Sequence, residues 1–282
     1  MFPGSFTYSR PGSVAEAVAA LQANPDAKII AGGHSLIPAM KLRLAMPGEL
    51  VDLRDIGELR GVEVSDDAVA VRAMTTYNEL RDNDEVAGLM PILPEAIQII
   101  GDAQVRERGT LVGSLVHNDP AADLTAVALA LGGSVHAVGS DGERDIPLDE
   151  FFVDLWTTTL ELDEVVTHAS LNRHDGAHMA YRKYAHPASG YAIVGVAVVV
   201  EKDGDTVSRA RVAVTGATNT ATRLTSIEEA LAGKPLTEDN VQAAVENAAE
   251  ELEINGDTFA SAEYRAHLVR VLARRALLGT QQ

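Results

Sequence analysis

A pair of adjacent glycines at the end of a short buried strand restricts the fold more than any other feature of this chain. The apolar run 28–31 predicts the strand, and Gly32 and Gly33 follow it directly. Because glycine adopts backbone conformations closed to other residues, consecutive N–H groups can point toward one anion there, beside the hydroxyl of Ser35. A glycine pair alone more often marks a turn, so this segment indicates phosphate binding only if a second one accompanies it.

A second segment rich in glycine and hydroxyl groups lies further along the chain, in Gly109, Thr110, Gly113 and Ser114. We expect both segments to be loops. Two such loops can hold one diphosphate, and a dinucleotide stretches across a groove between subdomains. Neither loop has the Gly-x-Gly-x-x-Gly spacing with an acidic residue about twenty positions later, which disfavours the Rossmann fold. The residues therefore favour a dinucleotide site of another fold.

The sequence offers no catalytic constellation and no metal site. Ser35 and Ser114 lack the Gly-x-Ser-x-Gly pattern of a hydrolase nucleophile. The chain has no cysteine, which excludes thiolate nucleophiles, disulfides and iron–sulfur ligation on it. His174 and His178 are spaced as i and i+4, but a glycine between them breaks a helix and no third ligand accompanies them, nor does one accompany His117. We expect the two linker histidines to be exposed to solvent.

The formal net charge is −18, from 41 acidic and 23 basic residues. A protein that binds nucleic acid needs a basic surface to displace counterions from phosphate, so nucleic acid is disfavoured as a partner. No stretch approaches the roughly 20 apolar residues that span a bilayer, and the first residues lack a basic region followed by an apolar run. We expect a cytoplasmic protein without membrane insertion.

Hydrophobic periodicity and capping residues predict an α+β chain of two domains. The expected elements are helices over 13–25, 124–131, 226–232, 237–252 and 262–278, a helix capped by Thr75 or Thr76, a strand over 165–171, and hairpins over 62–72 and 192–214. A polar, glycine-containing linker at 172–176 places the domains at 1–175 and 176–282. The arginines of the last helix, expected on a solvated face, are Arg265, Arg270, Arg274 and Arg275.

The two glycine segments, in this order and at this separation, resemble the flavoprotein subunit of the carbon monoxide dehydrogenase and xanthine dehydrogenase family of molybdenum hydroxylases. The resemblance spans essentially the whole chain and includes the segments 6–8, 151–152, 163–166 and 260–265. It implies an FAD-binding domain of the para-cresol methylhydroxylase type, with two α/β subdomains. A smaller α+β domain of the carbon monoxide dehydrogenase flavoprotein type is implied to follow it.

The resemblance also implies which residues bind a non-covalent FAD. The matches at 31–35 and 109–114 wrap the pyrophosphate, Asp123 lies near the flavin and ribityl chain, and Lys183 lies close to the isoalloxazine. Tyr191 covers one face of the ring, although without the resemblance it reads as a core tyrosine at the start of a strand. The full set of expected FAD contacts is Ala31, Gly32, Gly33, His34, Ser35, Leu36, Gly109, Thr110, Gly113, Ser114, His117, Asp123, Val165, Lys183 and Tyr191.

One residue departs from the family pattern. The second segment usually reads Thr-Leu-Gly-Gly, but Val112 replaces the first glycine of that pair here. Valine resists a positive φ angle. Either this position never needs the glycine conformation, or the phosphate lies farther from this backbone than usual and FAD binds less tightly.

The function implied by the resemblance is electron transfer within a complex. A large subunit with the molybdenum cofactor oxidises the substrate, [2Fe-2S] clusters on a small subunit pass the electrons on, and FAD on this chain collects them for an external acceptor. A dimer of heterotrimers is expected, with peripheral attachment to the inner membrane as an option. The alternatives are a stand-alone flavin oxidase with FAD bonded to His34 and a nucleotide-binding regulatory module. The sequence indicates neither the substrate nor the acceptor.

Overall fold

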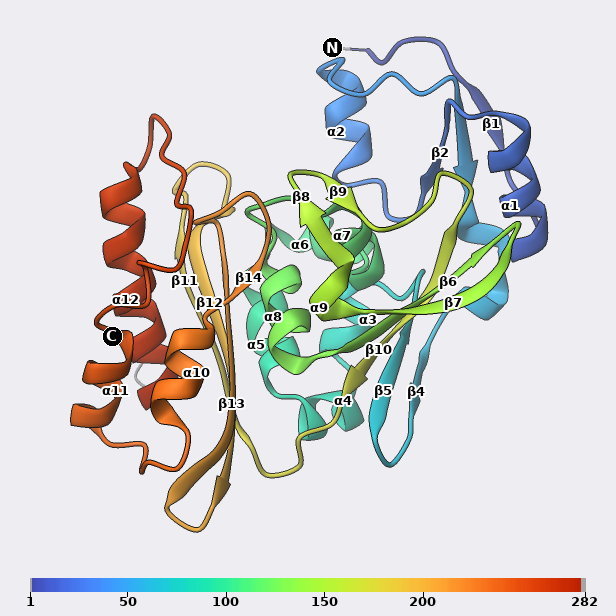
Figure 1. Cartoon of the computed structure of the whole chain (residues 1–282). Helices are drawn as coiled ribbons and strands as arrows, with labels where there is room; N and C mark the ends of the chain where they lie inside the picture. Colours follow the sequence, from blue (N-terminus) through green and yellow to red (C-terminus); the bar gives the residue numbers. More distant parts are fainter. Residues whose placement is uncertain (1, 280–282) are drawn as a thin grey trace.

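The computed structural model describes residues 2–279 (Figure 1). Two large hydrophobic cores lie on opposite faces of the C-terminal sheet, and its strand β12 (Ala192–Asp203) contributes to both because its alternate side chains point to opposite faces. Ala197 and Val199 belong to the first core, whereas Val196 and Val198 belong to the second. A strand covered on both faces is continuously apolar, which explains the buried run 192–200.

The first subdomain is a parallel sheet in the order β1-β3-β2, flanked by two helices. Its elements are β1 (Thr7–Ser9), α1 (Val14–Ala23), β2 (Ala27–Ile30), α2 (Leu36–Lys41) and β3 (Glu49–Asp52), then the 3₁₀ helices η1 (Leu53–Asp55) and η2 (Gly57–Leu59). Ser13 caps α1 as predicted, because its hydroxyl accepts a hydrogen bond from the N–H of Glu16. Strand β2 ends directly before the first glycine segment, also as predicted.

The second subdomain is an antiparallel sheet in the order β4-β5-β10-β6-β7, with several helices packed beside it. Its elements are β4 (Val62–Val64), β5 (Ala68–Arg72), α3 (Tyr77–Arg81), α4 (Asp84–Leu89), α5 (Ile92–Gln98), α6 (Ala103–Arg108), α7 (Leu111–His117), α8 (Asp123–Leu131), β6 (Gly133–Gly139), β7 (Gly142–Pro147), α9 (Leu148–Phe151), β8 (Phe152–Asp154), β9 (Thr157–Thr158) and β10 (Val165–Asn172). Of the two predicted caps for the helix after β5, Thr76 is the one used, in a full capping box with Glu79.

Helix α8 joins the two domains. All of its residues are buried, as expected for a helix that is apolar around its whole circumference. It packs on α5 and α7 on one side and on β12 and β13 (Thr206–Thr215) on the other. The start of α8, at Asp123, therefore lies between the first domain and the C-terminal sheet.

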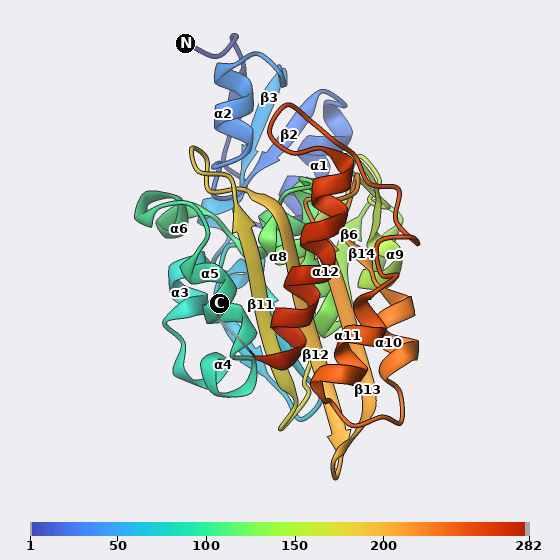
Figure 2. The same ribbon diagram turned by 90° about the vertical axis from the view of Figure 1, so that its left-hand side faces the viewer.

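The C-terminal domain is an antiparallel sheet in the order β11-β12-β13-β14, with its own helices on the face opposite α8 (Figure 2). Its remaining elements are β11 (His178–Ala185), β14 (Thr222–Arg223), α10 (Thr225–Leu231), α11 (Glu238–Val245) and α12 (Ala262–Leu278). The predicted helix 237–252 is too long, because regular helix ends at Val245 and turns continue to Leu252. No helix among residues 2–279 is long and apolar enough to cross a membrane.

The expectation that the arginines of the last helix are solvated is wrong for Arg265. Its side chain is buried, and its guanidinium donates to the carbonyls of Ile193 and Gly216 and to the carboxylate of Asp257. The five donors of a guanidinium let one buried arginine satisfy several acceptors, and this one ties α12 to two strands. Periodicity cannot distinguish such a residue from a solvated arginine.

The expectation of two exposed linker histidines is also wrong. His178 begins β11 and is half-buried, with Nε2 2.8 Å from the carbonyl oxygen of Ala276. The departure is larger for His174. Its ring is buried, with Nε2 2.7 Å from the carbonyl oxygen of Leu131 and Nδ1 2.5 Å from the carboxylate of Glu201. The ring therefore binds the carboxyl end of α8, where carbonyl groups lack partners within the helix. The histidine holds the two domains together.

Candidate functional site

The two glycine segments lie side by side, although they are far apart in sequence. A Cβ atom added at Gly32 would lie 2.0 Å from the carbonyl oxygen of Arg108, so the two backbones are in direct contact. A Cβ atom at Gly113 would lie 3.9 Å from the Cβ of Ala31. Gly32 therefore has to be glycine for packing, because no side chain fits between the segments.

The first segment presents backbone donors without protein partners. Gly33 has a φ of +75°, which glycine adopts at no steric cost. Among the described residues, no hydrogen-bond acceptor is paired with the N–H groups of Gly32, Gly33, His34 or Ser35. Adjacent unpaired N–H groups in such a turn form an anion-binding concavity. The donor set fits a phosphate group.

The second segment is a helix start, not the predicted loop. Thr110 is the N-cap of α7, and its hydroxyl accepts a hydrogen bond from the N–H of Gly113 at 3.0 Å. The N–H groups of Leu111 and Val112 belong to the first turn and have no partner within the helix. A helix begins here because the Thr110 side chain satisfies one of the N–H groups of the first turn. It still presents amide donors next to the first segment.

The helix also explains the departure at Val112. This residue lies inside α7 and is buried, and its φ angle is not positive. Of the two readings of the valine, the structure therefore favours the one in which this position never needs the glycine conformation. A β-branched side chain is tolerated in a helix and contributes to the core.

Tyr77 supports the second segment and was not anticipated. A Cβ atom at Gly109 would lie 2.5 Å from the Tyr77 ring, so this glycine admits the ring. Burial raises the pKa of Tyr77 to about 12, and the phenol hydrogen-bonds with Ser114. The charge of Asp123 raises the same pKa further, so that carboxylate lies within electrostatic reach of the second segment. A single buried aromatic in a helix gives no sequence signal for this role.

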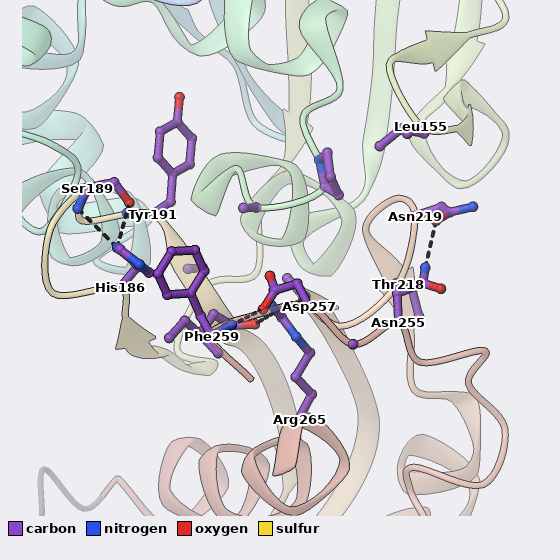
Figure 3. Close-up of a pocket in the computed structure, with 16 residues that line it drawn as sticks. Leu155, His186, Ser189, Tyr191, Thr218, Asn219, Asn255, Asp257, Phe259 and Arg265 are labelled. Carbon is purple, nitrogen blue, oxygen red and sulfur yellow. Dashed lines mark hydrogen bonds and ion pairs between the residues drawn. The ribbon is translucent and has the colours of Figure 1, made fainter. Parts of the chain in front are cut away.

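Tyr191 lies before β12 and is 45% exposed, so it is not a core tyrosine. Burial of its hydroxyl end is the main cause that raises its pKa, followed by the charges of Asp119 and Asp123. A hydrogen bond with Ser35 of the first segment lowers the pKa. The ring points away from Phe259 at the edge of a cavity (Figure 3). Tyr191 therefore lies beside the first glycine segment.

The predicted residues Asp123 and Lys183 form a buried ion pair. The ammonium nitrogen Nζ of Lys183 is 2.9 Å from Oδ1 of Asp123, with the two side chains only 2% and 6% exposed. The same Nζ donates to the carbonyl of Ile99 at 3.2 Å, and the hydroxyl of Tyr181 donates to Oδ1 of Asp123 at 2.6 Å. Burial raises the pKa of Asp123, while Lys183 and Tyr181 act in the opposite direction.

Four other predicted contacts lie around or away from this cluster. The side chain of His34 is exposed, with Nδ1 3.3 Å from the Gly32 carbonyl oxygen, and Leu36 begins α2. His117 ends α7, where burial lowers the pKa of its ring. Val165 is fully buried and pairs with Val138 inside the second sheet, with no described contact to the glycine segments. Their contacts with FAD stay predictions.

A cavity of about 470 Å³ is lined in part by Tyr191 (Figure 3). Pro120 and Ala121 line it from the first domain, and Phe259 and Arg265 line it from the C-terminal domain. The unpaired amides of the first glycine segment make that place a candidate phosphate site, beside the start of α7. Among residues 2–279, no three histidine or acidic side chains are grouped so as to hold a metal ion.

Comparison with known proteins identifies both domains. Residues 4–171 match the FAD binding domain in molybdopterin dehydrogenase, and residues 179–280 match the CO dehydrogenase flavoprotein C-terminal domain. The carbon monoxide dehydrogenase medium chain of Hydrogenophaga pseudoflava is 39% identical over 98% of this chain and 97% of its own length. The nicotine 6-hydroxylase medium subunit of Paenarthrobacter nicotinovorans is 36% identical, over 96% of this chain and 95% of its own.

Solved structures agree over nearly the whole chain. Carbon monoxide dehydrogenase from Hydrogenophaga pseudoflava superposes with a TM-score of 0.95 at 40% identity, covering 99% of this chain and 98% of that one. Quinoline 2-oxidoreductase from Pseudomonas putida 86 gives a TM-score of 0.94 at 32% identity, with the same coverage. The predicted α+β fold with an FAD-binding domain first is confirmed. The chain belongs to the molybdenum hydroxylase family, as an FAD-binding medium subunit of the carbon monoxide dehydrogenase type.

Proposed function

We propose that this chain binds FAD without a covalent bond, accepts electrons from the [2Fe-2S] clusters of a small partner subunit, and passes them to an external acceptor. The observation that carries the proposal is the contact between the two glycine segments, which brings two sets of unpaired amide donors to one place. Such paired donors match the two phosphates of a dinucleotide. FAD suits the role because it exchanges one or two electrons.

The residues of the chain hold and tune the cofactor in this proposal. The amides of Gly32, Gly33 and the first turn of α7 bind the pyrophosphate and exclude water from it. Lys183 places an ammonium group near the ring, and Asp123 limits the net charge that this ammonium brings into the buried site. Tyr191 covers one face of the ring. No side chain needs to act as a general base.

The partners we propose are a large subunit with the molybdenum cofactor and a small subunit with [2Fe-2S] clusters, assembled as a dimer of heterotrimers in the cytoplasm. Relatives that are named medium chains or subunits support a larger and a smaller partner chain. The absence of cysteine agrees with it, because iron–sulfur ligation then needs another chain. Peripheral attachment to the inner membrane through the complex stays a prediction.

The test is to co-express the chain with the large and small subunits proposed above and to purify the complex. We expect one FAD per chain, release of all flavin on denaturation, and anaerobic bleaching of the flavin when the complex is reduced through its iron–sulfur clusters. A complex without flavin would contradict the proposal. Flavin that stays attached to the denatured chain, and is lost in His34→Ala, would favour the rival oxidase with a covalent bond at His34.

A further inference from the structure

Tyr181 occupies a buried position at the joint between the two domains. Its side chain is 2% exposed and is the largest among the fully buried side chains of the described residues. The phenol reaches from β11 to the first turn of α8, where its hydroxyl donates to Oδ1 of Asp123 at 2.6 Å. A buried tyrosine hydroxyl needs an acceptor, and here the acceptor is a charged residue of the proposed flavin site.

Gly195 on the neighbouring strand makes room for that hydroxyl. A Cβ atom at Gly195 would lie 2.1 Å from the Tyr181 hydroxyl oxygen and 2.9 Å from the carbon that bears it. Gly195 pairs with Lys183 in the middle of the β11–β12 ladder. Glycine weakens a central strand and often marks a close approach of another group. The absence of a side chain at Gly195 therefore leaves the space that the Tyr181 hydroxyl occupies.

The hydroxyl acts on Lys183 through Asp123. The Asp123 carboxylate accepts hydrogen bonds from the phenol and from the Lys183 ammonium, and the ammonium also donates to the carbonyl of Ile99. The ammonium nitrogen lies 2.9 Å from Oδ1 and 3.0 Å from Oδ2 of Asp123 and 3.2 Å from the Ile99 carbonyl oxygen, so these acceptors can use all three of its N–H donors. Both ends of the ion pair are thus fixed by neighbours from opposite domains.

The same carboxylate lies within electrostatic reach of both glycine segments. The charge of Asp123 raises the pKa of Tyr77, which hydrogen-bonds with Ser114, and the pKa of Tyr191, which hydrogen-bonds with Ser35. The charge of Asp123 therefore acts on one tyrosine beside each glycine segment.

We propose that Tyr181 is a positioning residue of the flavin site, which holds Asp123 as the charged partner of the Lys183 ammonium and so sets the reduction potential of the bound flavin. This inference rests on the proposed function above. Without the hydroxyl, the carboxylate loses a charge-assisted hydrogen bond that offsets part of its negative charge, and it is less firmly held beside the ammonium. The negative charge that is no longer offset disfavours the reduced, more negative form of the flavin.

The test compares matched variants of the purified complex by anaerobic spectroelectrochemical titration of the flavin. In Tyr181→Phe, which keeps the ring, we expect FAD at the wild-type stoichiometry and a lower midpoint potential. In Gly195→Ala, the added methyl group displaces the hydroxyl, and we expect a shift in the same direction. Tyr184→Phe on the same strand, with a side chain that is 44% exposed, and Gly88→Ala, with open space around its Cβ, are the controls and should match wild type.

A purely structural role would lower the melting temperature of Tyr181→Phe and leave the potential unchanged. That result, with the flavin bound, would overturn the inference. A wild-type complex that contains no flavin would instead overturn the proposed function, so the two failures are distinguishable.

Discussion

The two halves of the proposed site use different chemistry. On the side of the first domain, the glycine segments offer backbone amides, and their contact depends on the absence of side chains at Gly32 and Gly109. Where the first domain meets the C-terminal domain, buried charged groups form the other half, above all Asp123 of α8 and Lys183 of β11. We call the first the backbone half and the second the charged half. Added side-chain atoms at the glycines should disrupt the backbone half, whereas the loss of one charge of the pair should disrupt the charged half. Substitutions should therefore affect the two halves in different ways.

The largest effect on stability is expected in the charged half. Lys183→Met leaves the Asp123 carboxylate buried without its partner, which typically costs about 3–5 kcal/mol. We expect that loss in the free energy of unfolding, measured with urea. The double variant Asp123→Asn with Lys183→Met removes both charges and should recover most of it. If the double variant is as unstable as the single one, packing and not charge dominates this half.

The largest effect on ligand binding is expected in the backbone half. In Gly32→Ala, the new methyl group collides with the backbone at Arg108, which cannot move as a side chain would. Overpacking of this kind costs about 1–3 kcal/mol and separates the two sets of amides. We expect FAD binding to weaken by about 5-fold to about 140-fold by the relation of 1.4 kcal/mol per tenfold, measured by flavin titration of the apoprotein, and the FAD content of the purified complex to fall with it. Gly57→Ala, with nothing near its Cβ, should keep full FAD content.

A smaller effect tests whether the second segment is a helix start. Val112→Gly restores the usual family residue, yet it removes a buried side chain and introduces glycine into α7. Glycine costs about 1 kcal/mol in a helix, and the lost burial of the valine side chain adds about 1.5 kcal/mol. We expect a lower melting temperature and no gain in FAD affinity, measured by flavin titration of the apoprotein. Tighter FAD binding by the variant would show that the glycine conformation is needed after all.

The smallest effect concerns pH. Burial lowers the pKa of His117 below its usual value of 6.5, so the folded state disfavours the protonated ring. Its contribution to stability is present above pH 6.5 and is lost as pH falls toward the lower folded value, because the unfolded chain binds the proton more readily. We expect His117→Gln to flatten the decline of the melting temperature below that pH. An identical decline in the variant would assign it to other groups.

The backbone half was readable from the sequence, and the charged half only in part. Glycines and hydroxyl residues act through their own backbone, so the positions of Gly32 and Thr110 follow from local pattern. Lys183 was found through the family resemblance and not through its surroundings. Tyr181 gave no signal, because its role depends on a strand partner and a helix start that meet only in the folded chain.

Two wrong expectations have the same cause. Arg265 and His174 are polar residues in segments that look exposed by composition, yet both satisfy backbone carbonyls inside the fold. Whether a polar side chain is buried depends on acceptors supplied by distant elements, such as the end of α8. Local periodicity carries no information on those acceptors. The predicted loop at 109–114 failed for a related reason, since a threonine cap can begin either a turn or a helix.

The most direct test of the central claim is hydrogen–deuterium exchange of the complex with FAD bound and after its removal. The account predicts slower exchange with FAD bound in two separate segments at once, residues 31–36 and residues 110–114, because both donate amides to one pyrophosphate. Exchange rates in either segment that are the same with FAD bound and after its removal would contradict the account.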